Sequence, residues 1–495
     1  MMGGGKSFAA VRDICYHSST PVIYAVPTIE LAKEIESHIR NADCGIYEEN
    51  GGFKDVGLDE NGERYKLDLP IKVILSDEYH SVQKEFIDAL IAYGHYAIIV
   101  THACLFALEN FNLLKGWKVF IDEDPHPLRV DIISDALHQI HFLNNLISNN
   151  THDLSEVTEF TIDDATQKQL EKLACLEYGQ GYRDSIKNYL QLLIDPKDKL
   201  LCFKNSEDKS IWGGVEWLPL KEIIQAAKET HILASILSPL THMYAEYKGI
   251  EIKPSPLSVR YCEYPKSLQK KVSIYRIWKD EPHSINLIKR YGKSQFEQKI
   301  SDFVNGREFI SRSNEVNQSL FKQMKNHKER LSKKTNGINR HDEKTMIVDC
   351  AAYNKPKDIN EIYKFIGTTY NIPVDKLIEG HQVQEGLEPS AQAVCRIGLR
   401  RIDNAPANEY IIVIPDQSTE DYLKKFYFPH ANYKGPIITE DVSNKAGPKE
   451  GSTNQNTIEK VAKAKELIEG GLSMNKAVKQ VGTTKSTYNK YSNLV

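Results

Sequence analysis

Short apolar runs alternate with amphipathic helical patterns up to about residue 130, and no other feature restricts the possible folds of this chain as strongly. A helical pattern, Ile29–Ile39, directly follows the first apolar run. Strands that alternate with helices form parallel sheets with helices on their faces. The runs predicted to be strands are Pro21–Val26, Ile71–Leu75, Tyr96–Thr101 and Lys118–Ile121. We therefore expect an α/β domain.

A second region with the same alternation predicts a second α/β domain over residues 256–440. The first domain is expected to span 1–255 and to carry a helical insertion at about 130–225, because Leu128–Asp208 is mostly helical and polar in pattern. The strand-like run Thr230–Leu237 resumes the first domain. In the second domain the predicted strands are Val272–Ile277, Thr345–Cys350 and Tyr410–Pro415, and the predicted helices are Asp358–Ile366 and Ser390–Arg401.

The C-terminal part of the chain is predicted to be a linker followed by a small all-α module. Residues 441–456 are rich in polar residues and contain Gly447-Pro448, which is typical of a linker. Residues 457–495 contain three short helical patterns, Ile458–Ile468, Met474–Gln480 and Thr484–Tyr491. The hydroxyl of Ser473 is placed to cap the second of these helices.

Composition narrows the class of protein. A chain of 495 residues is too long for one ordinary domain. It has no apolar run long enough to cross a membrane, and its eight cysteines lack zinc-site spacing. From the residues MMGGGKS we expect no signal peptide. We therefore expect a cytoplasmic protein with reduced thiols. The net charge is −4, but the run Lys322–Lys344 has eight basic and three acidic residues, and Asn454–Val495 has seven lysines and three glutamates. A local surplus of basic residues favours contact with phosphate groups at those segments. For Lys322–Lys344, a solvated helix face explains the surplus equally well.

A glycine-rich start and a pair of acids indicate a nucleotide site. Gly3-Gly4-Gly5-Lys6-Ser7 is the end of a phosphate-binding loop, in which backbone N–H groups surround phosphate, the lysine reaches the outer phosphates and the serine holds Mg²⁺. Such a loop follows a buried strand, so we expect the native chain to begin about 10–30 residues upstream and this one to hydrolyse ATP weakly.

The acids come directly after the run Lys118–Ile121. Asp122 suits Mg²⁺, and Glu123 suits orienting the attacking water. Asp77 and Glu78 form a competing pair after another apolar run. We prefer Asp122 and Glu123 because no residue separates them from the strand.

The order of these motifs resembles that of superfamily 2 helicases of the DEAD/DEAH-like type. Pro27-Thr28 and Thr101-His102 are similar to motifs that contact the nucleic-acid backbone in that family, and Asp122-Glu123-Asp124-Pro125 is similar to its acidic box. Leu233–Ser238 lies where the family carries Ser-Ala-Thr, with a loose match. The resemblance implies two RecA-like domains, ATP and Mg²⁺ as cofactors, and a single strand of nucleic acid along the motor.

Two further segments of the second domain extend the resemblance. Glu385-Gly386-Leu387-Glu388 is similar to motif V of the family, and Gln392–Arg401 is similar to motif VI, which supplies arginines to the transferring phosphoryl group. Arg396 fits the family position. The second family arginine falls on Leu399, so Arg400 lies one residue late.

The C-terminal module is similar to a resolvase-type helix-turn-helix. The resemblance implies that its last helix enters the major groove of duplex DNA. That helix offers Thr484, Lys485, Ser486 and Lys490 to phosphate, while Asn489 could read an adenine edge. A protein-interaction module is the alternative.

Together these features predict an ATP hydrolase that translocates on or unwinds nucleic acid and is targeted to DNA by its C-terminal module. Such a combination suits replication or recombination in a phage or mobile element. A DNA-packaging ATPase of the terminase type is one alternative, although the second half lacks the clustered carboxylates of a nuclease. A non-enzymatic DNA-binding protein on a degenerate motor fold is the other.

Overall fold

The computed structural model describes residues 6–40, 46–47, 53–54, 70–79, 81–133, 158–160, 168, 199–204, 210–257, 263–314, 317–331, 343–353, 359–400, 408–440, 455–481, 483 and 488. The chain forms two compact units. One contains residues 1–284 and 297–438, and the other contains residues 285–296 and 439–495.

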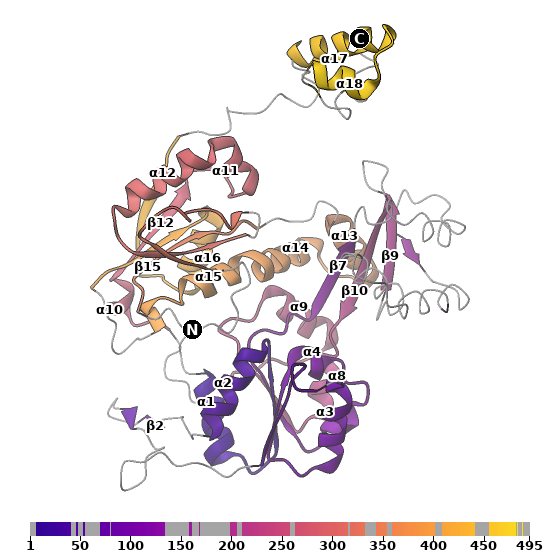
Figure 1. The fold of residues 1–495 in the computed structure, drawn as a ribbon. Coiled ribbons are helices and arrows are strands. Elements are labelled where there is room, and N and C mark those ends of the chain that lie inside the picture. The colour runs from indigo at the N-terminus through magenta and orange to yellow at the C-terminus, as the bar shows by residue number, and fades with distance from the viewer. Residues whose placement is uncertain are drawn as a thin grey trace. The chain divides into compact units, whose positions relative to one another are not determined.

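The first unit begins with a parallel sheet of strand order β11-β6-β1-β5-β4. Figure 1 draws this sheet in the lower part of the view, between helices. All five residues of its central strand are buried, as expected for a parallel sheet covered on both faces. Four predicted apolar runs are confirmed as strands, and the predicted run Thr230–Leu237 is a strand only as far as Ile232. The strands are β1 (Val22–Val26), β4 (Ile71–Ile74), β5 (Ala97–Thr101), β6 (Lys118–Ile121) and β11 (Glu229–Ile232).

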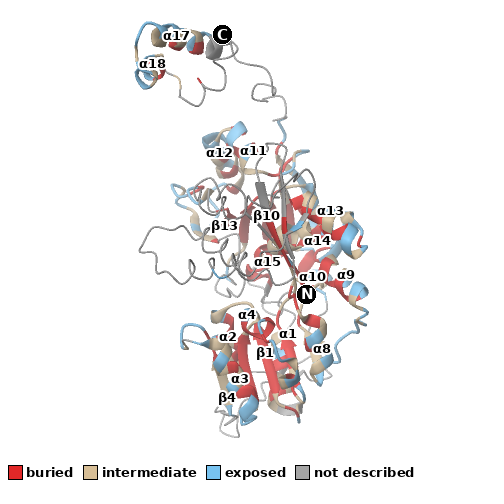
Figure 2. Ribbon diagram, turned by 90° about the vertical axis from the view of Figure 1, so that its right-hand side faces the viewer, coloured by how far each residue is buried: buried red, intermediate tan, exposed pale blue. Residues whose placement is uncertain are grey.

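Alternate residues of β1 pack against helices on opposite faces of this sheet. Tyr24 belongs to a core with α1 (Lys6–Arg12), the π-helical turn η1 (Asp13–His17) and α2 (Ile29–Arg40). Ile23 belongs to the core on the other face. Figure 2 shows β1 coloured as buried. The elements of that second face are α3 (Val82–Ala92), α4 (His102–Phe106), the 3₁₀ turn η2 (Phe111–Leu114), α8 (Leu220–Ala226) and α9 (Pro239–Lys248).

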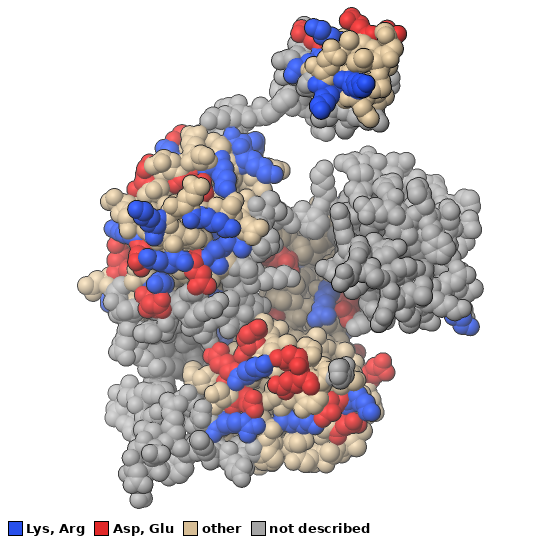
Figure 3. All heavy atoms as spheres, viewed as in Figure 1, with Lys and Arg blue, Asp and Glu red and all other residues tan. Residues whose placement is uncertain are grey.

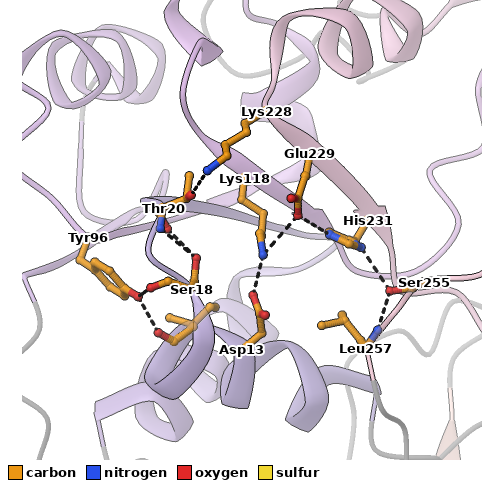
Figure 4. Close-up of polar contacts among 11 residues, drawn as sticks. Asp13, Ser18, Thr20, Tyr96, Lys118, Lys228, Glu229, His231, Ser255 and Leu257 are labelled. Atoms are coloured by element: carbon orange, nitrogen blue, oxygen red, sulfur yellow. Dashed lines mark hydrogen bonds and ion pairs between the residues drawn. The ribbon is translucent and has the colours of Figure 1, made fainter.

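Polar contacts tie together the amino ends of the strands in this sheet (Figure 4). The Lys118 ammonium lies 3.0 Å from Asp13 Oδ2 and 3.3 Å from Glu229 Oε2. Lys228 Nζ donates to Thr20 Oγ1 at 2.6 Å. These contacts fix η1 and the starts of β6 and β11, so the opposite, carboxyl edge of the sheet is the edge left for a site.

Between residues 128 and 217 a helical insertion was expected, but β7, β8, β9 and β10 instead form an antiparallel sheet of order β7-β10-β9-β8. Lys168 is the one described residue in this range that is helical. Earlier in the chain, β2 (Ile46–Tyr47) and β3 (Phe53–Lys54) form a separate hairpin. The antiparallel sheet was not predicted for two reasons. β10 contains Gly213-Gly214, which breaks the apolar alternation, and β10 pairs with β7, which is far away in sequence. The strands are β7 (Leu128–Ile133), β8 (Thr158–Phe160), β9 (Lys199–Lys204) and β10 (Ser210–Trp217).

The second α/β domain is a parallel sheet of order β14-β13-β15-β16-β12-β17. The predicted strands are confirmed as β12 (Val272–Trp278), β15 (Met346–Cys350) and β16 (Tyr410–Ile414). Three strands were not predicted: β13 (Phe309–Ser313), β14 (His327–Leu331) and β17 (Asn432–Ile438). The helices that accompany the sheet are α10 (Lys266–Gln269), α12 (Lys293–Val304), α15 (Glu388–Val394) and α16 (Gln417–Phe426).

A nearly continuous helical run leads into this sheet. After α13 (Ile359–Tyr370), it consists of α14 (Val374–Gln382), the π-helical turn η5 (Val383–Leu387) and α15. The predicted helix Ser390–Arg401 is too long: α15 ends at Val394, and only the 3₁₀ turn η6 (Gly398–Arg400) follows. Beyond Val394 the helical ladder is not continued: the Arg396 N–H donates to Ala393 O at 3.1 Å, and the Gly398 N–H donates to Lys344 O at 2.8 Å.

The second unit contains α11 (Ile285–Tyr291), α17 (Gln455–Glu469) and α18 (Met474–Gln480). A left-handed Gly471 (φ 92°) ends α17. Ser473 occupies the N-cap position of α18, but the predicted hydroxyl cap is wrong because its side chain makes no capping hydrogen bond. Of the predicted third helix only Tyr488 is described, buried against Val461 and Val478. None of the helices in the described parts of the chain could span a membrane.

Candidate nucleotide site

Three segments that are far apart in sequence meet at the carboxyl edge of the first sheet. α1 begins with Lys6 and Ser7, Asp122 follows β6, and Ser235 follows β11. Ser7 Oγ donates to Asp122 Oδ2 at 3.1 Å, and Lys6 Nζ donates to Ser235 Oγ at 2.9 Å. The structure therefore brings together the lysine, serine and aspartate that the sequence predicted to bind a nucleotide and its metal.

The Asp122 carboxylate is buried, with 5% of the residue exposed. Burial raises its pKa, and hydrogen bonds from Tyr24 and Ser7 together with the charge of Lys6 oppose that shift. The Tyr24 hydroxyl donates to Oδ2 at 3.0 Å. Two hydroxyls, one cation and the backbone N–H of Glu123 thus stabilise this buried negative charge.

These oxygens fit a magnesium ion. Mg²⁺ takes one or two protein oxygens and completes its shell with water and phosphate oxygens. Ser7 and Asp122 provide a hydroxyl and a carboxylate 3.1 Å apart. No group of three or more His, Cys, Asp or Glu side chains is placed to hold a metal in the described ranges, so nothing there forms an all-protein cage.

The neighbouring acids have different roles. Glu123 has a left-handed backbone (φ 70°), which costs a non-glycine residue energy. Asp124 is buried and accepts hydrogen bonds from the Ser238 N–H and the Thr241 hydroxyl. It also accepts from the His126 N–H at 3.2 Å. Asp124 thereby fixes the loop after β6 to the start of α9, while the strained Glu123 lies beside the site.

The competing acidic pair lies on the surface. Asp77 and Glu78 are exposed in the turn after the edge strand β4, and Asp77 pairs with Lys33 at 2.7 Å. Neither is joined to Ser7 or Lys6 by a hydrogen bond between described residues.

The predicted nucleic-acid contacts of the first domain are partly used within the fold. The Thr28 hydroxyl accepts from the Leu31 N–H, and the Thr101 hydroxyl caps α4 by accepting from the Cys104 N–H. Pro27 is partly exposed. His102 is largely enclosed, and burial lowers its pKa to about 4, so the side chain is neutral at pH 7 and offers no positive charge to phosphate.

Positive charge in the described part of the basic run 322–344 is partly neutralised. Lys328 and Lys344 both contact Glu308, at 2.8 and 4.0 Å. In Figure 3, basic and acidic side chains mix on the visible face.

In the second domain, Arg396 is buried beyond the end of α15, with 3% of the residue exposed. Glu388 is a structural carboxylate: it accepts hydrogen bonds from the hydroxyls of Tyr422 at 2.7 Å and Tyr427 at 2.8 Å. Glu385 lies in the π-helical turn η5. The segment predicted to be motif V is therefore helical, and one of its acids serves the core.

Several predicted site residues lie outside the described parts of the chain. They are Gly3, Gly4 and Gly5 at the N-terminus, the Arg400 side chain, and Thr484, Lys485, Ser486, Asn489 and Lys490 in the C-terminal module.

Two polar features of the structure were not predicted from the sequence. Tyr24 was treated as part of an apolar run, although a tyrosine in the otherwise aliphatic Val22–Val26 was a signal. The fully buried pair Arg312–Asp349, 2.9 Å apart, was also missed, together with Ser390, which donates to the same carboxylate. These residues join β13, β15 and α15 at the carboxyl edge of the second sheet.

Comparison with known proteins gave no sequence relative. No known protein family and no curated protein matches the chain. Among solved structures, a Dbp5 variant of S. cerevisiae bound to a Gle1 variant and IP6 is 10% identical, with a TM-score of 0.31 over 89% of this chain and 83% of that one. The yeast DEAD-box splicing factor Prp28 is 12% identical, with a TM-score of 0.20 over 90% of this chain and 74% of that one.

Proposed function

We propose that this protein is a nucleic-acid-dependent ATPase that translocates on or unwinds its substrate. The observation that carries the proposal is the meeting of Lys6, Ser7, Asp122 and Ser235 at one sheet edge, with hydrogen bonds of 2.9 and 3.1 Å. Parallel α/β sheets bind their ligands at the carboxyl ends of the strands, and these residues lie there.

Each residue has a role that follows from its chemistry. Lys6 neutralises negative charge on the outer phosphates, and Ser235 positions its ammonium group when no phosphate is bound. Ser7 and Asp122 would hold Mg²⁺, which would supply positive charge beside the phosphoryl oxygens. Glu123 orients the attacking water and accepts its proton. Arg396, supplied by the second domain, stabilises charge on the transferring phosphoryl group.

ATP hydrolysis with and without single-stranded DNA or RNA tests this proposal. We expect hydrolysis that the nucleic acid stimulates and that Lys6→Ala abolishes, because removal of a phosphate-binding charge costs several powers of ten in rate. Lys33→Ala is the matched control, since Lys33 is an exposed lysine paired with Asp77. Equal activity in the two variants, or no hydrolysis by the unaltered chain, would overturn the proposal.

We further propose that the C-terminal unit binds duplex DNA and directs the motor to it, in replication or recombination of a phage or mobile element. Its lysine surplus supports this part of the proposal. The complete chain and a chain lacking 457–495 should be titrated with duplex DNA at two salt concentrations. We expect the complete chain to bind more tightly, by a margin that falls at high salt. Equal binding would identify the unit as a protein-interaction module.

A further inference from the structure

A buried tyrosine contacts the carboxylate that we assign to the metal. The Tyr24 hydroxyl lies 3.0 Å from Asp122 Oδ2, the same oxygen that receives the Ser7 hydroxyl at 3.1 Å. Tyr24 is fully buried in the central strand β1. Between described side chains, the hydrogen bonds to this carboxylate all end on Oδ2.

The pairing register explains why a tyrosine is needed there. β1 and β6 are parallel, with Tyr24 opposite Phe120 and Ala25 opposite Ile121, so Asp122 lies one step beyond the pair. Side chains alternate between faces, which places Tyr24, Phe120 and Asp122 on the face covered by α1. Two residues along a strand span about 6.6 Å. A phenol reaches that distance, whereas a serine or threonine at position 24 would not.

We propose that Tyr24 is a positioning residue for the metal: its hydroxyl holds Asp122 Oδ2 so that the carboxylate keeps one orientation when Ser7 turns to Mg²⁺. This inference rests on the proposed nucleotide site. With Mg²⁺ bound, Ser7 would serve as a ligand, and Tyr24 would remain as the side-chain donor that fixes the carboxylate. Its role is separate from the affinity for the nucleotide itself, which depends on Lys6.

Substitution Tyr24→Phe removes the hydroxyl and keeps the ring in the core. The probe is the fluorescent nucleotide mant-ADP, titrated with Mg²⁺ and, separately, without metal in EDTA. We expect the Mg²⁺ concentration needed for tight nucleotide binding to rise about tenfold, the usual effect of one lost hydrogen bond to a charged group. Metal-free binding should stay within about twofold, because the phosphate contacts of Lys6 are retained.

Tyr96→Phe is the matched control. The Tyr96 hydroxyl also donates inside the first domain, but to the backbone carbonyls of Ile14 and Ser18. That variant should leave the Mg²⁺ dependence unchanged. Thermal unfolding of both variants, followed by circular dichroism, separates a general loss of stability from a change at the metal.

Two further results decide the inference. In a chain that already carries Asp122→Asn, Tyr24→Phe should produce no additional change in Mg²⁺ dependence, since it acts through that carboxylate. An unchanged Mg²⁺ dependence in Tyr24→Phe, or an equal loss of metal-free binding, would overturn the positioning role while leaving the proposed function intact. Failure of the unaltered chain to bind mant-ADP would overturn both together.

Discussion

At the scale of single residues, the two acids after β6, for which we propose different roles, have different surroundings. Asp122 is buried, accepts hydrogen bonds from two hydroxyls and lies near Lys6, so its position is fixed. Glu123 follows it in a left-handed conformation. Asp122 is buried, whereas the left-handed Glu123 is partly exposed, so the two carboxylates differ in their access to water.

Glu123→Gln tests these proposed roles. We expect turnover to fall at least about 100-fold, because the amide cannot accept the proton of the attacking water. Nucleotide binding should be retained, since the metal-holding acid is intact. Steady-state hydrolysis and equilibrium nucleotide binding measure the two properties separately.

Glu78→Gln provides the comparison because Glu78 is an exposed acid of the competing pair. It should behave as the unaltered chain does. If Glu78→Gln abolished turnover and Glu123→Gln did not, the assignment of the acids would be wrong.

At the scale of secondary-structure elements, His283 connects strands at the carboxyl edge of the second sheet. Trp278 Nε1 at the end of β12 donates to His283 Nδ1 at 2.7 Å, and His283 Nε2 lies 3.0 Å from Cys350 O at the end of β15. The backbone N–H of His283 donates to Asp416 Oδ2 at 3.0 Å. These contacts need a neutral ring with its proton on Nε2, because Nδ1 acts as the acceptor.

This arrangement predicts a loss of stability in acid. Burial lowers the pKa of His283, opposed by its bond to Cys350 and the charges of Asp416 and Asp349. The unfolded chain takes up the proton at about pH 6.5, whereas the folded chain resists it. The free energy of unfolding should therefore fall as pH drops from about 6.5 towards the lower folded-state pKa.

Denaturant unfolding at several pH values would measure this effect. The decline between neutral and acid pH should be smaller in His283→Gln, while the exposed His430→Gln should retain the full decline. An identical decline in all three chains would show that His283 does not contribute.

The sequence predicted these elements unevenly. Fully buried parallel strands such as Lys118–Ile121 are recognisable because their apolar runs are local. The antiparallel sheet was missed because its strands are stabilised by partners far away in the chain. At the site, Lys6, Ser7 and Asp122 were predicted from motifs. Tyr24 could not be, since its role depends on the register of β1 against β6 across 98 positions of sequence.

At the scale of the whole first unit, α9, which follows the first parallel sheet, contacts α14, which leads into the second parallel sheet. Gly380 in α14 permits this contact. A Cβ at that position would lie 2.3 Å from Leu240 Cγ and 3.1 Å from the Leu240 backbone nitrogen. The core around Leu240 also contains Leu128 and Val215 from the antiparallel sheet, and Ile362 from α13.

Gly380→Ala should therefore destabilise the first unit by about 1–3 kcal/mol, the usual cost of overpacking. The midpoint of denaturant unfolding measures the loss. Leu240→Ala in the same chain removes the colliding atoms, so the double variant should lose less stability than the sum of the single variants.

Gly435→Ala is a suitable control because nothing lies within 4 Å of its added Cβ. That variant should leave the midpoint unchanged or slightly raised. Additive losses from Gly380→Ala and Leu240→Ala would contradict the contact.

The left-handed backbone of Glu123 has a consequence for laboratory evolution. Glycine adopts positive φ without the steric cost that glutamate bears, so Glu123→Gly should yield a chain that resists proteolysis better but no longer hydrolyses ATP. In a library of variants at position 123, selection for resistance to proteolysis should enrich glycine. Selection for ATP turnover should retain glutamate. Opposite enrichment in the two selections would show that glutamate at position 123 is retained for activity although it lowers resistance to proteolysis.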